Sequence, residues 1–290
     1  MLIDAHNHPN WHGHDAARIL RNMDEHDIDQ MWLLAWEAPE DEYDPSYHAV
    51  LPPAGSGIPL ADVLAVTREA PDRFVPGYIP HPKRRDAVDR LKAAVEIHGI
   101  RLAGELKVRL PFDDPDALRL YDYCGSARLP VTIHLDYPID HGRGSYPRPN
   151  WWYGGSIEAL ERSLCACRGT IFVGHAPGFW AHISADGQHD KVVYPDGPIV
   201  PGGRVPQLLR SYPNLWADLS AGSALRALQR DTAHARQFIL EFQDRLLFAR
   251  DYFDARLMEF LTGLQLPATV LDKLKAGNAL RLLAEYPSEG

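Results

Sequence analysis

Residues 102–135 read LAGELKVRLPFDDPDALRLYDYCGSARLPVTIHL. Two aliphatic runs in this stretch, Leu102–Val108 and Pro130–Leu135, are typical of buried β-strands. Between them, Pro115–Ala127 carries apolar residues at helical spacing, and two aspartates directly before the proline form an acidic helix start. A strand, a helix and a second strand in this order predict two parallel neighbours in one sheet.

The same alternation continues along the chain in both directions. Eight aliphatic or β-branched runs are predicted strands: Leu2–Ala5, Gln30–Leu34, Phe74–Ile79, Leu102–Val108, Pro130–Leu135, Thr170–Gly174, Asn214–Leu219 and Arg245–Ala249. Amphipathic segments between them are predicted helices, among them Ala16–His26, Ala61–Ala70, Arg85–His98, Pro115–Ala127, Ser156–Cys167 and Val205–Tyr212. Eight such repeats predict an α/β fold, a closed (β/α)8 TIM barrel. Because no linker signal divides the chain, we expect residues 1–290 to form a single domain.

Composition narrows the class of protein and its partners. A chain of 290 residues with 45% hydrophobic and 24% charged residues is typical of a soluble globular protein. The net charge of −9 argues against nucleic acid as a partner, and no apolar run approaches the roughly 20 residues of a membrane span. Three cysteines and a strand-like start without a signal peptide favour a reducing compartment, and we expect a cytoplasmic protein.

Long irregular stretches follow three of the predicted strands: Trp36–Pro59, Asp136–Gly155 and Pro177–Gly203. In a parallel barrel these would be loops on the C-terminal rim, where barrel enzymes keep their active sites. Several aromatic residues in them could line a pocket for a small molecule: Tyr137, Trp151, Trp152, Tyr153, Phe179 and Trp180. Four further histidines near this rim are expected to pack within loops: His12, His14, His141 and His182.

Histidines and an aspartate lie where predicted strands end. His6 and His8 follow the first strand and, because side chains alternate along a strand, they point the same way. His134, His175 and Asp251 each come directly after a later aliphatic run. The strand ends of a parallel barrel converge on one rim, so these side chains predict a site for a divalent metal. Zinc is the expected ion, with manganese as the alternative.

The order of these residues resembles the amidohydrolase superfamily: His-x-His on strand one, His on strands five and six, and Asp on strand eight. Within it, the chain is similar to the amidohydrolase-related group that contains the aminocarboxymuconate-semialdehyde decarboxylase type. Two stretches carry this similarity, Gly174-His175-Ala176-Pro177-Gly178-Phe179-Trp180 and Gly277-Asn278-Ala279-Leu280-Arg281-Leu282. The resemblance spans nearly the whole chain and implies a metal-dependent hydrolase with His6, His8, His134, His175 and Asp251 as ligands.

The fourth strand decides how many ions the site holds. Glu105, Lys107 and Arg109 share one face of this strand. TatD-like hydrolases carry a metal-bridging Glu after Gly here, and phosphotriesterase-like members use a carboxylated Lys. We assign the bridge to Glu105, with Lys107 as the alternative; an ion pair between the two is also open, and mononuclear members of the decarboxylase-like group lack a bridge. The site therefore holds one or two ions.

One position departs from the family pattern. The strand-eight carboxylate is often preceded there by Gly-Ser or Gly-Thr, whereas this chain has Ala249-Arg250-Asp251. Arg250 either packs outward without a role or alters the anionic contacts of the rim. Three cations could instead hold a substrate carboxylate, namely Lys107, Arg109 and Arg143.

The expected reaction is hydrolysis of a small carbonyl compound, namely an ester, a lactone or an amide. Asp251 would take a proton from the metal-activated water and return it to the leaving group, while His175 would donate a hydrogen bond to the oxyanion. Trp180 and Tyr137 are expected to contact the substrate. Decarboxylation of an unsaturated or aromatic acid stays open as the alternative. A barrel without activity is disfavoured by the intact ligand set, and a TatD-like nuclease by the negative charge. Such barrels often pair, so a homodimer is open.

Overall fold

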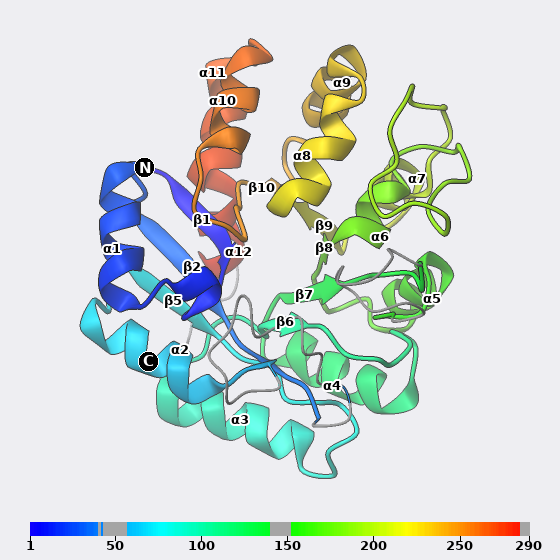
Figure 1. Cartoon of the computed structure of the whole chain (residues 1–290). Helices are drawn as coiled ribbons and strands as arrows, with labels where there is room; N and C mark the ends of the chain where they lie inside the picture. The colour runs from blue at the N-terminus through cyan, green and yellow to red at the C-terminus, as the bar shows by residue number, and fades with distance from the viewer. Residues whose placement is uncertain (40–41, 43–56, 140–151, 285–290) are drawn as a thin grey trace.

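Parallel strands form the centre of the protein, with helices around them (Figure 1). The computed structural model describes residues 1–39, 42, 57–139 and 152–284. Three parallel strands make one sheet, in the order β1 (Ile3–Asn7), β2 (Gln30–Leu34) and β5 (Phe74–Gly77). Five more make a second parallel sheet, in the order β10 (Leu246–Leu247), β9 (Leu215–Asp218), β8 (Phe172–His175), β7 (Val131–His134) and β6 (Glu105–Leu106). A separate antiparallel pair consists of β3 (Trp36–Glu37) and β4 (Gly57–Ile58).

The two parallel sheets meet at both edges. Gly77 of β5 bridges to Leu102, just before β6, and the Tyr78 amide donates to the Leu102 carbonyl at 3.0 Å. At the other edge, the Ala5 amide of β1 donates to the Phe248 carbonyl, just after β10, at 3.0 Å. The eight strands therefore close into a TIM barrel, which confirms the predicted fold.

Each of the eight predicted runs overlaps a strand, but β6 is much shorter than the run Leu102–Val108. Gly104 interrupts this run with a φ of +61°, and a Cβ at that position would collide with the Ala35 carbonyl. The Glu105 amide then donates to the same carbonyl at 3.2 Å. Glycine is needed here because the chain must approach the end of β2 closely. The approach carries Glu105 to the mouth of the barrel.

Six helices match the predicted amphipathic segments: α1 (Ala16–Glu25), α2 (Leu60–Glu69), α3 (Ala87–His98), α4 (Pro115–Ser126), α5 (Ile157–Ala166) and α7 (Arg204–Ser211). Their boundaries follow from local chemistry. Asp15 and Ser156 cap the first turns of α1 and α5 by accepting backbone amides, and Gly99 ends α3 in the left-handed region.

The structure adds helices that those predictions did not include: the 3₁₀ turn η1 (Trp11–Gly13), α6 (Pro177–Ala181), α8 (Ala221–Gln229), α9 (Thr232–Phe242), α10 (Arg256–Gly263), α11 (Ala268–Asp272), the π-helical turn η4 (Lys273–Gly277) and α12 (Asn278–Ala284). The stretch Pro177–Gly203, expected to be irregular, therefore begins with a short helix. Within the described ranges, no helix has the length and apolar character needed to cross a bilayer.

Candidate metal centre

Four imidazoles meet at the ends of β1, β7 and β8. The Nε2 atoms of His6 and His8 are 3.2 Å apart. The ring of His175 lies 4.2 Å from that of His6 and 5.2 Å from that of His134, measured between centroids. All four side chains are buried. The structure thus brings together the four histidines that the strand ends predicted.

Two carboxylates reach the same cluster. Glu105 places Oε1 2.6 Å from His134 Nδ1 and Oε2 3.3 Å from His8 Nε2. Asp251 places Oδ1 3.5 Å from His8 Nε2 and Oδ2 3.7 Å from His175 Nε2. Among the described residues, three groups of three have potential ligand atoms within 4.8 Å of one another: His6, His8 and Asp251; Glu105, His134 and His175; and His6, His175 and Asp218.

The carboxylates also show that the cluster fits a cation. Glu105 Oε2 and Asp251 Oδ1 are buried atoms that accept no hydrogen bond from the described residues. A buried carboxylate oxygen without a partner is costly, and a divalent ion would supply the missing charge for both. Imidazole nitrogens with carboxylate oxygens are a donor set that zinc or manganese accepts. The residues present therefore fit a divalent metal.

Asp218, at the end of β9, orients two of the imidazoles. Its Oδ2 lies 2.8 Å from His6 Nδ1, and its Oδ1 lies 3.0 Å from His175 Nδ1. Ser220 Oγ donates to the same Oδ1 at 2.6 Å and lies 2.8 Å from His175 Nδ1. When both Nδ1 atoms donate to Asp218, each ring presents Nε2 to the centre of the cluster. Sequence reasoning missed Asp218, although it ends a predicted strand just as His134 does.

The remaining imidazoles are held by other acceptors. His8 Nδ1 lies 2.7 Å from the Leu34 carbonyl, so its Nε2 faces the cluster. His134 lies between two carboxylates, because its Nε2 is 2.8 Å from Asp136 Oδ2 while its Nδ1 contacts Glu105. Asp136 is a second acidic residue that sequence reasoning missed; it follows β7 by two positions.

Neighbouring charges shift the pKa of Glu105 downward and that of His175 upward. Burial acts to raise the pKa of Glu105, but the charge of Lys107 and a hydrogen bond from His134 hold it well below its usual range. Burial acts to lower the pKa of His175, yet Asp218, with the charges of Glu105 and Asp251, raises it to about 9. Glu105 is therefore ionised at neutral pH, and its negative charge attracts a cation.

Of the three residues predicted to share one face of the fourth strand, Glu105 and Lys107 are buried and Arg109 is exposed. Lys107 is buried, and its Nζ lies 5.2 Å from the ring centroid of Trp36 and 5.7 Å from that of Tyr153. Arg109 is exposed instead, with its guanidinium 5.8 Å from the Trp152 ring. Strand β6 ends at Leu106, so side-chain alternation does not extend to Arg109. Its predicted contact with the substrate is not supported by this position.

A cavity of about 390 Å³ opens beside the cluster, a size suited to a small molecule. Three candidate metal ligands line one part of the cavity, namely His134, His175 and Asp251. Aromatic rings of Trp11, Tyr194 and Tyr252 line it elsewhere, together with the cations Lys107, Arg226 and Arg256. The proposed ligands therefore have direct access to a bound molecule.

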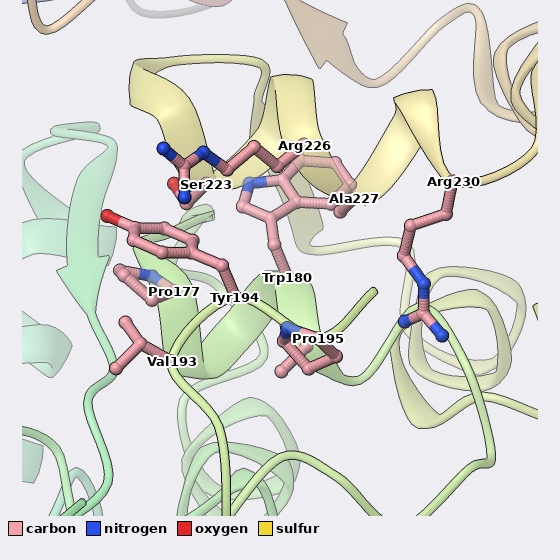
Figure 2. Close-up of a pocket in the computed structure, with 10 residues that line it drawn as sticks. Pro177, Trp180, Val193, Tyr194, Pro195, Ser223, Arg226, Ala227 and Arg230 are labelled. Carbon is pink, nitrogen blue, oxygen red and sulfur yellow. The ribbon is translucent and has the colours of Figure 1, made fainter. Parts of the chain in front are cut away.

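Two predicted substrate contacts lie away from this cavity. Trp180 is 1% exposed and packs edge-on against Phe238; Figure 2 shows its indole directed toward α8. The cause is α6, which begins at Pro177 and turns this side chain inward. The hydroxyl of Tyr137 forms a hydrogen bond with His182 Nε2, at 2.7 Å. Neither residue lines this cavity, so their position gives no support to the predicted contacts with a molecule bound there.

Arg250 points inward, contrary to the expectation that it packs outward. Its guanidinium donates from Nε to Asp4 Oδ2 at 2.8 Å and from Nη2 to Asn22 Oδ1 at 2.9 Å. Both side chains of the ion pair are buried. The pair ties the end of β10 to β1 directly beside Asp251, whose φ of +47° is unusual for a non-glycine residue. Of the other rim residues considered, His141, Arg143 and Trp151 lie outside the described residues.

Comparison with known proteins agrees with this architecture. Among curated proteins, no sequence matches the chain. An uncharacterized TIM-barrel protein from Bordetella bronchiseptica is 19% identical, with a TM-score of 0.65 over 98% of this chain and 99% of that one. A dihydroxybenzoic acid decarboxylase from Polaromonas, solved with manganese and 2-nitroresorcinol, is 15% identical, with a TM-score of 0.63 over 99% of this chain and 98% of that one.

A third structure, a probable 2-pyrone-4,6-dicarboxylic acid hydrolase from Acinetobacter baumannii with bound citric acid, is 13% identical, with a TM-score of 0.58 over 98% of this chain and 99% of that one. At these identities the likenesses show the fold alone. The family model described as Amidohydrolase, however, matches residues 3–284, nearly the whole chain. A closed barrel with histidines and carboxylates at its mouth is the arrangement that the family resemblance implied, and the chain belongs to the amidohydrolase family.

Proposed function

We propose that this protein is a metal-dependent hydrolase of small carbonyl compounds. The observation that carries the proposal is the pair of buried carboxylate oxygens, on Glu105 and Asp251, that accept no hydrogen bond within the described residues while four imidazoles surround them. A cavity of about 390 Å³ beside them gives a substrate access. Esters, lactones and amides all present the carbonyl that such a centre can attack.

The proposed ligand roles use two of the three groups of donors. His6, His8 and Asp251 would hold one ion, and Glu105 with His134 and His175 offers a place for a second. Zinc is the expected ion and manganese the alternative. When bound, the ion supplies Lewis acidity and lowers the pKa of water toward neutrality. Lys107 is the less suitable bridge, because its ammonium lies over two aromatic rings.

Two residues of the chain would move or hold protons. Asp251 lines the cavity and has an oxygen that accepts no hydrogen bond from any residue that the structure describes, so it would take a proton from the attacking water and return it to the leaving group. His175 donates from Nδ1 to Asp218 and presents Nε2 toward Asp251. With its pKa raised to about 9, His175 would donate a hydrogen bond from Nε2 to a developing oxyanion. This donor role and its ligand role are alternatives.

Decarboxylation is the second candidate function. Its support is the likeness to the dihydroxybenzoic acid decarboxylase, which covers 99% of this chain. On this alternative the same centre would hold an aromatic or unsaturated acid, and a proton donor such as His175 would protonate the carbon that loses carbon dioxide. The two functions differ in their products, so one set of assays separates them.

The deciding experiment combines elemental analysis with a substrate panel. The purified chain is expected to bind at least one zinc or manganese ion and to hydrolyse a lactone or an ester from the panel. Chelation should abolish both properties, and readdition of the ion should restore them. Release of carbon dioxide from an acid panel, without ester or lactone hydrolysis, would establish the alternative. A protein that binds neither ion would contradict both functions.

Asp251→Asn tests the assignment within that experiment. It should lose both the ion and turnover. Asp254→Asn is the matched control, because Asp254 is three positions away, more exposed and paired with Arg256 at 2.7 Å. This control should retain metal and activity.

A further inference from the structure

Arg226 of α8 lines the same cavity as the metal cluster. Its guanidinium lies over the ring of Tyr194, 4.4 Å from the centroid. Figure 2 shows the side chain reaching from α8 across this ring, with Ser223 beside the guanidinium. Within the part of the chain that the structure describes, no carboxylate lies within ion-pair distance of this guanidinium. An arginine facing a cavity without a carboxylate partner is available to an anionic ligand.

The other cations of the cavity are already engaged. Arg256 donates from Nε to Asp254 Oδ2 at 2.7 Å, and the charge of Lys107 acts on the buried carboxylate of Glu105. Among the three cations that line the cavity within the described residues, Arg226 is therefore the one best placed to bind a second charged group of a substrate.

Tyr194 fixes the position of Arg226 relative to the cluster. Burial raises the pKa of Tyr194, and the nearby charges of Asp136 and Asp251 raise it further while Arg226 lowers it. The ring therefore lies within electrostatic reach of both the guanidinium and the carboxylates of the centre. Its hydroxyl stays protonated, so the ring remains a neutral platform for the guanidinium.

The loop that carries Tyr194 is tied to the same helix region. Arg230 follows the end of α8, and its buried guanidinium pairs with Asp186. The same side chain donates from Nε to the Gly197 carbonyl at 3.0 Å and from Nη2 to the Pro198 carbonyl at 3.1 Å. These bonds hold the loop on both sides of Tyr194 against α8. The platform beneath Arg226 is thus formed before a ligand binds, which reduces the entropy lost on binding.

We propose that Arg226 binds a carboxylate of the substrate, and that the substrate is a small planar acid with a second reacting group at the metal centre. The inference rests on the proposed function, because that function supplies the group at the other end. A guanidinium fork matches a carboxylate with two parallel hydrogen bonds. Aromatic walls from Trp11, Tyr194 and Tyr252 suit a flat ring, and about 390 Å³ accommodates one. In hydrolysis the second group is a carbonyl; in decarboxylation it is another carboxylate.

Binding of unreactive probes tests this inference without turnover. Titration calorimetry on the metal-loaded full chain would compare benzoate with isophthalate and terephthalate, whose second carboxylates differ in position. The unmodified protein should bind at least one dicarboxylate about tenfold more tightly than benzoate. Arg226→Gln should remove this preference, and Arg226→Lys should retain part of it. Arg236→Gln, on the exposed face of α9, is the control and should leave it unchanged.

The outcomes separate this inference from the proposed function. A preference that disappears in Arg226→Gln, in a protein that hydrolyses nothing on the panel, would support the carboxylate site and reject the hydrolase. No preference in the unmodified protein, or an undiminished preference in Arg226→Gln, would overturn the carboxylate site even if esters are hydrolysed. If Arg226→Gln does not fold, Arg226→Lys decides: a preference reduced by threefold or more supports the site, and an unchanged one rejects it.

Discussion

Two closely packed pairs of histidines near the mouth of the barrel have opposite electrostatic surroundings. The rings of His6 and His175 lie 4.2 Å apart between centroids, and so do those of His182 and His189. Burial acts to lower the pKa of both His175 and His182. At His175 the carboxylate of Asp218 and its neighbours reverse this effect and raise the pKa to about 9. At His182 burial dominates, and the pKa falls to about 3.

The difference lies in the acceptors around each pair. Asp218 accepts from both rings of the first pair, whereas the neutral hydroxyl of Tyr137 contacts the ring of His182. A neutral buried imidazole beside a phenol is a packing arrangement, and it gives no reason for a cation to bind. Converging carboxylates, more than the number of histidines, therefore mark the candidate metal centre.

The largest expected effect comes from removing a carboxylate of the centre. Asp251→Asn should lower kcat/KM for the identified substrate by about 10³-fold or more, because it removes both a proposed ligand and the proposed proton acceptor. Steady-state kinetics with elemental analysis would measure both losses. If this variant kept full activity, the carboxylates around His6 and His175 would have only a structural role, as the surroundings of His182 and His189 have.

A second variant tests the buried ion pair between Arg250 and Asp4, which lies beside Asp251. Arg250→Met leaves Asp4 charged, buried and without its ion-pair partner, which should lower the free energy of unfolding by about 3–5 kcal/mol. Urea unfolding followed by circular dichroism would measure the change. Arg256→Met is the control, since its pair with Asp254 is exposed and contributes about 0–1 kcal/mol. Equal losses in the two variants would contradict the role of the buried pair.

Asp218→Asn would make the first histidine pair resemble the second. The amide cannot accept from the rings as a charged carboxylate does, so His6 and His175 lose their fixed orientation. We expect the affinity for zinc or manganese to fall about 10–100-fold, the range for such indirect supports. Competition with a chelating dye would measure it. An unchanged affinity would indicate that Asp218 has no part in positioning the rings.

The smallest effect is a pH dependence of stability from His182. Folding lowers the pKa of His182 from 6.5 to about 3. Between these two pH values the imidazole is protonated in the unfolded chain and neutral in the folded chain. The stabilisation is complete above pH 6.5 and is lost progressively as the pH falls toward 3. Between pH 7 and 5 the unfolding free energy should drop by about 1–2 kcal/mol from this group.

Replacing His182 should flatten that pH profile. His182→Gln keeps a side chain that can accept from Tyr137 and removes the titration, so its stability should change less between pH 7 and 5 than that of the parent. His98→Gln, exposed at the end of α3, is the matched control. An identical pH slope in parent and His182→Gln would reject the assignment.

The barrel could be predicted because its strands are continuous aliphatic runs with recognisable helices between them. Helix α8 had no comparable signal at its start. Ser220 occupies the N-cap position but makes no capping bond, since its hydroxyl is used by Asp218 and lies beside His175, and Ala221 has a φ of +57°. The residues that begin this helix therefore contact the cluster, and their local conformational preferences do not predict a helix.

The histidines of the site could be predicted because each ends an aliphatic run, which fixes its position on the rim. Partners such as Asp218 and Arg250 were missed or misjudged because their roles depend on contacts across the barrel, over 43 to 246 residues of sequence. The prediction for Trp180 had a different weakness. An aromatic residue after a strand does not predict the helical turn that directs its ring inward.

The edge where β1 meets β10 has a consequence for the order in which the protein is made. Ala5 bonds to Phe248, and the Asp251 amide donates to the His6 carbonyl at 2.8 Å. On the ribosome, His6 and His8 emerge long before Asp251, and its carboxylate joins these imidazoles only after the strands between β1 and β10 have been synthesised. A complete donor set is therefore a property of the closed barrel, and an ion that needs all of it would be captured only after β10 has met β1.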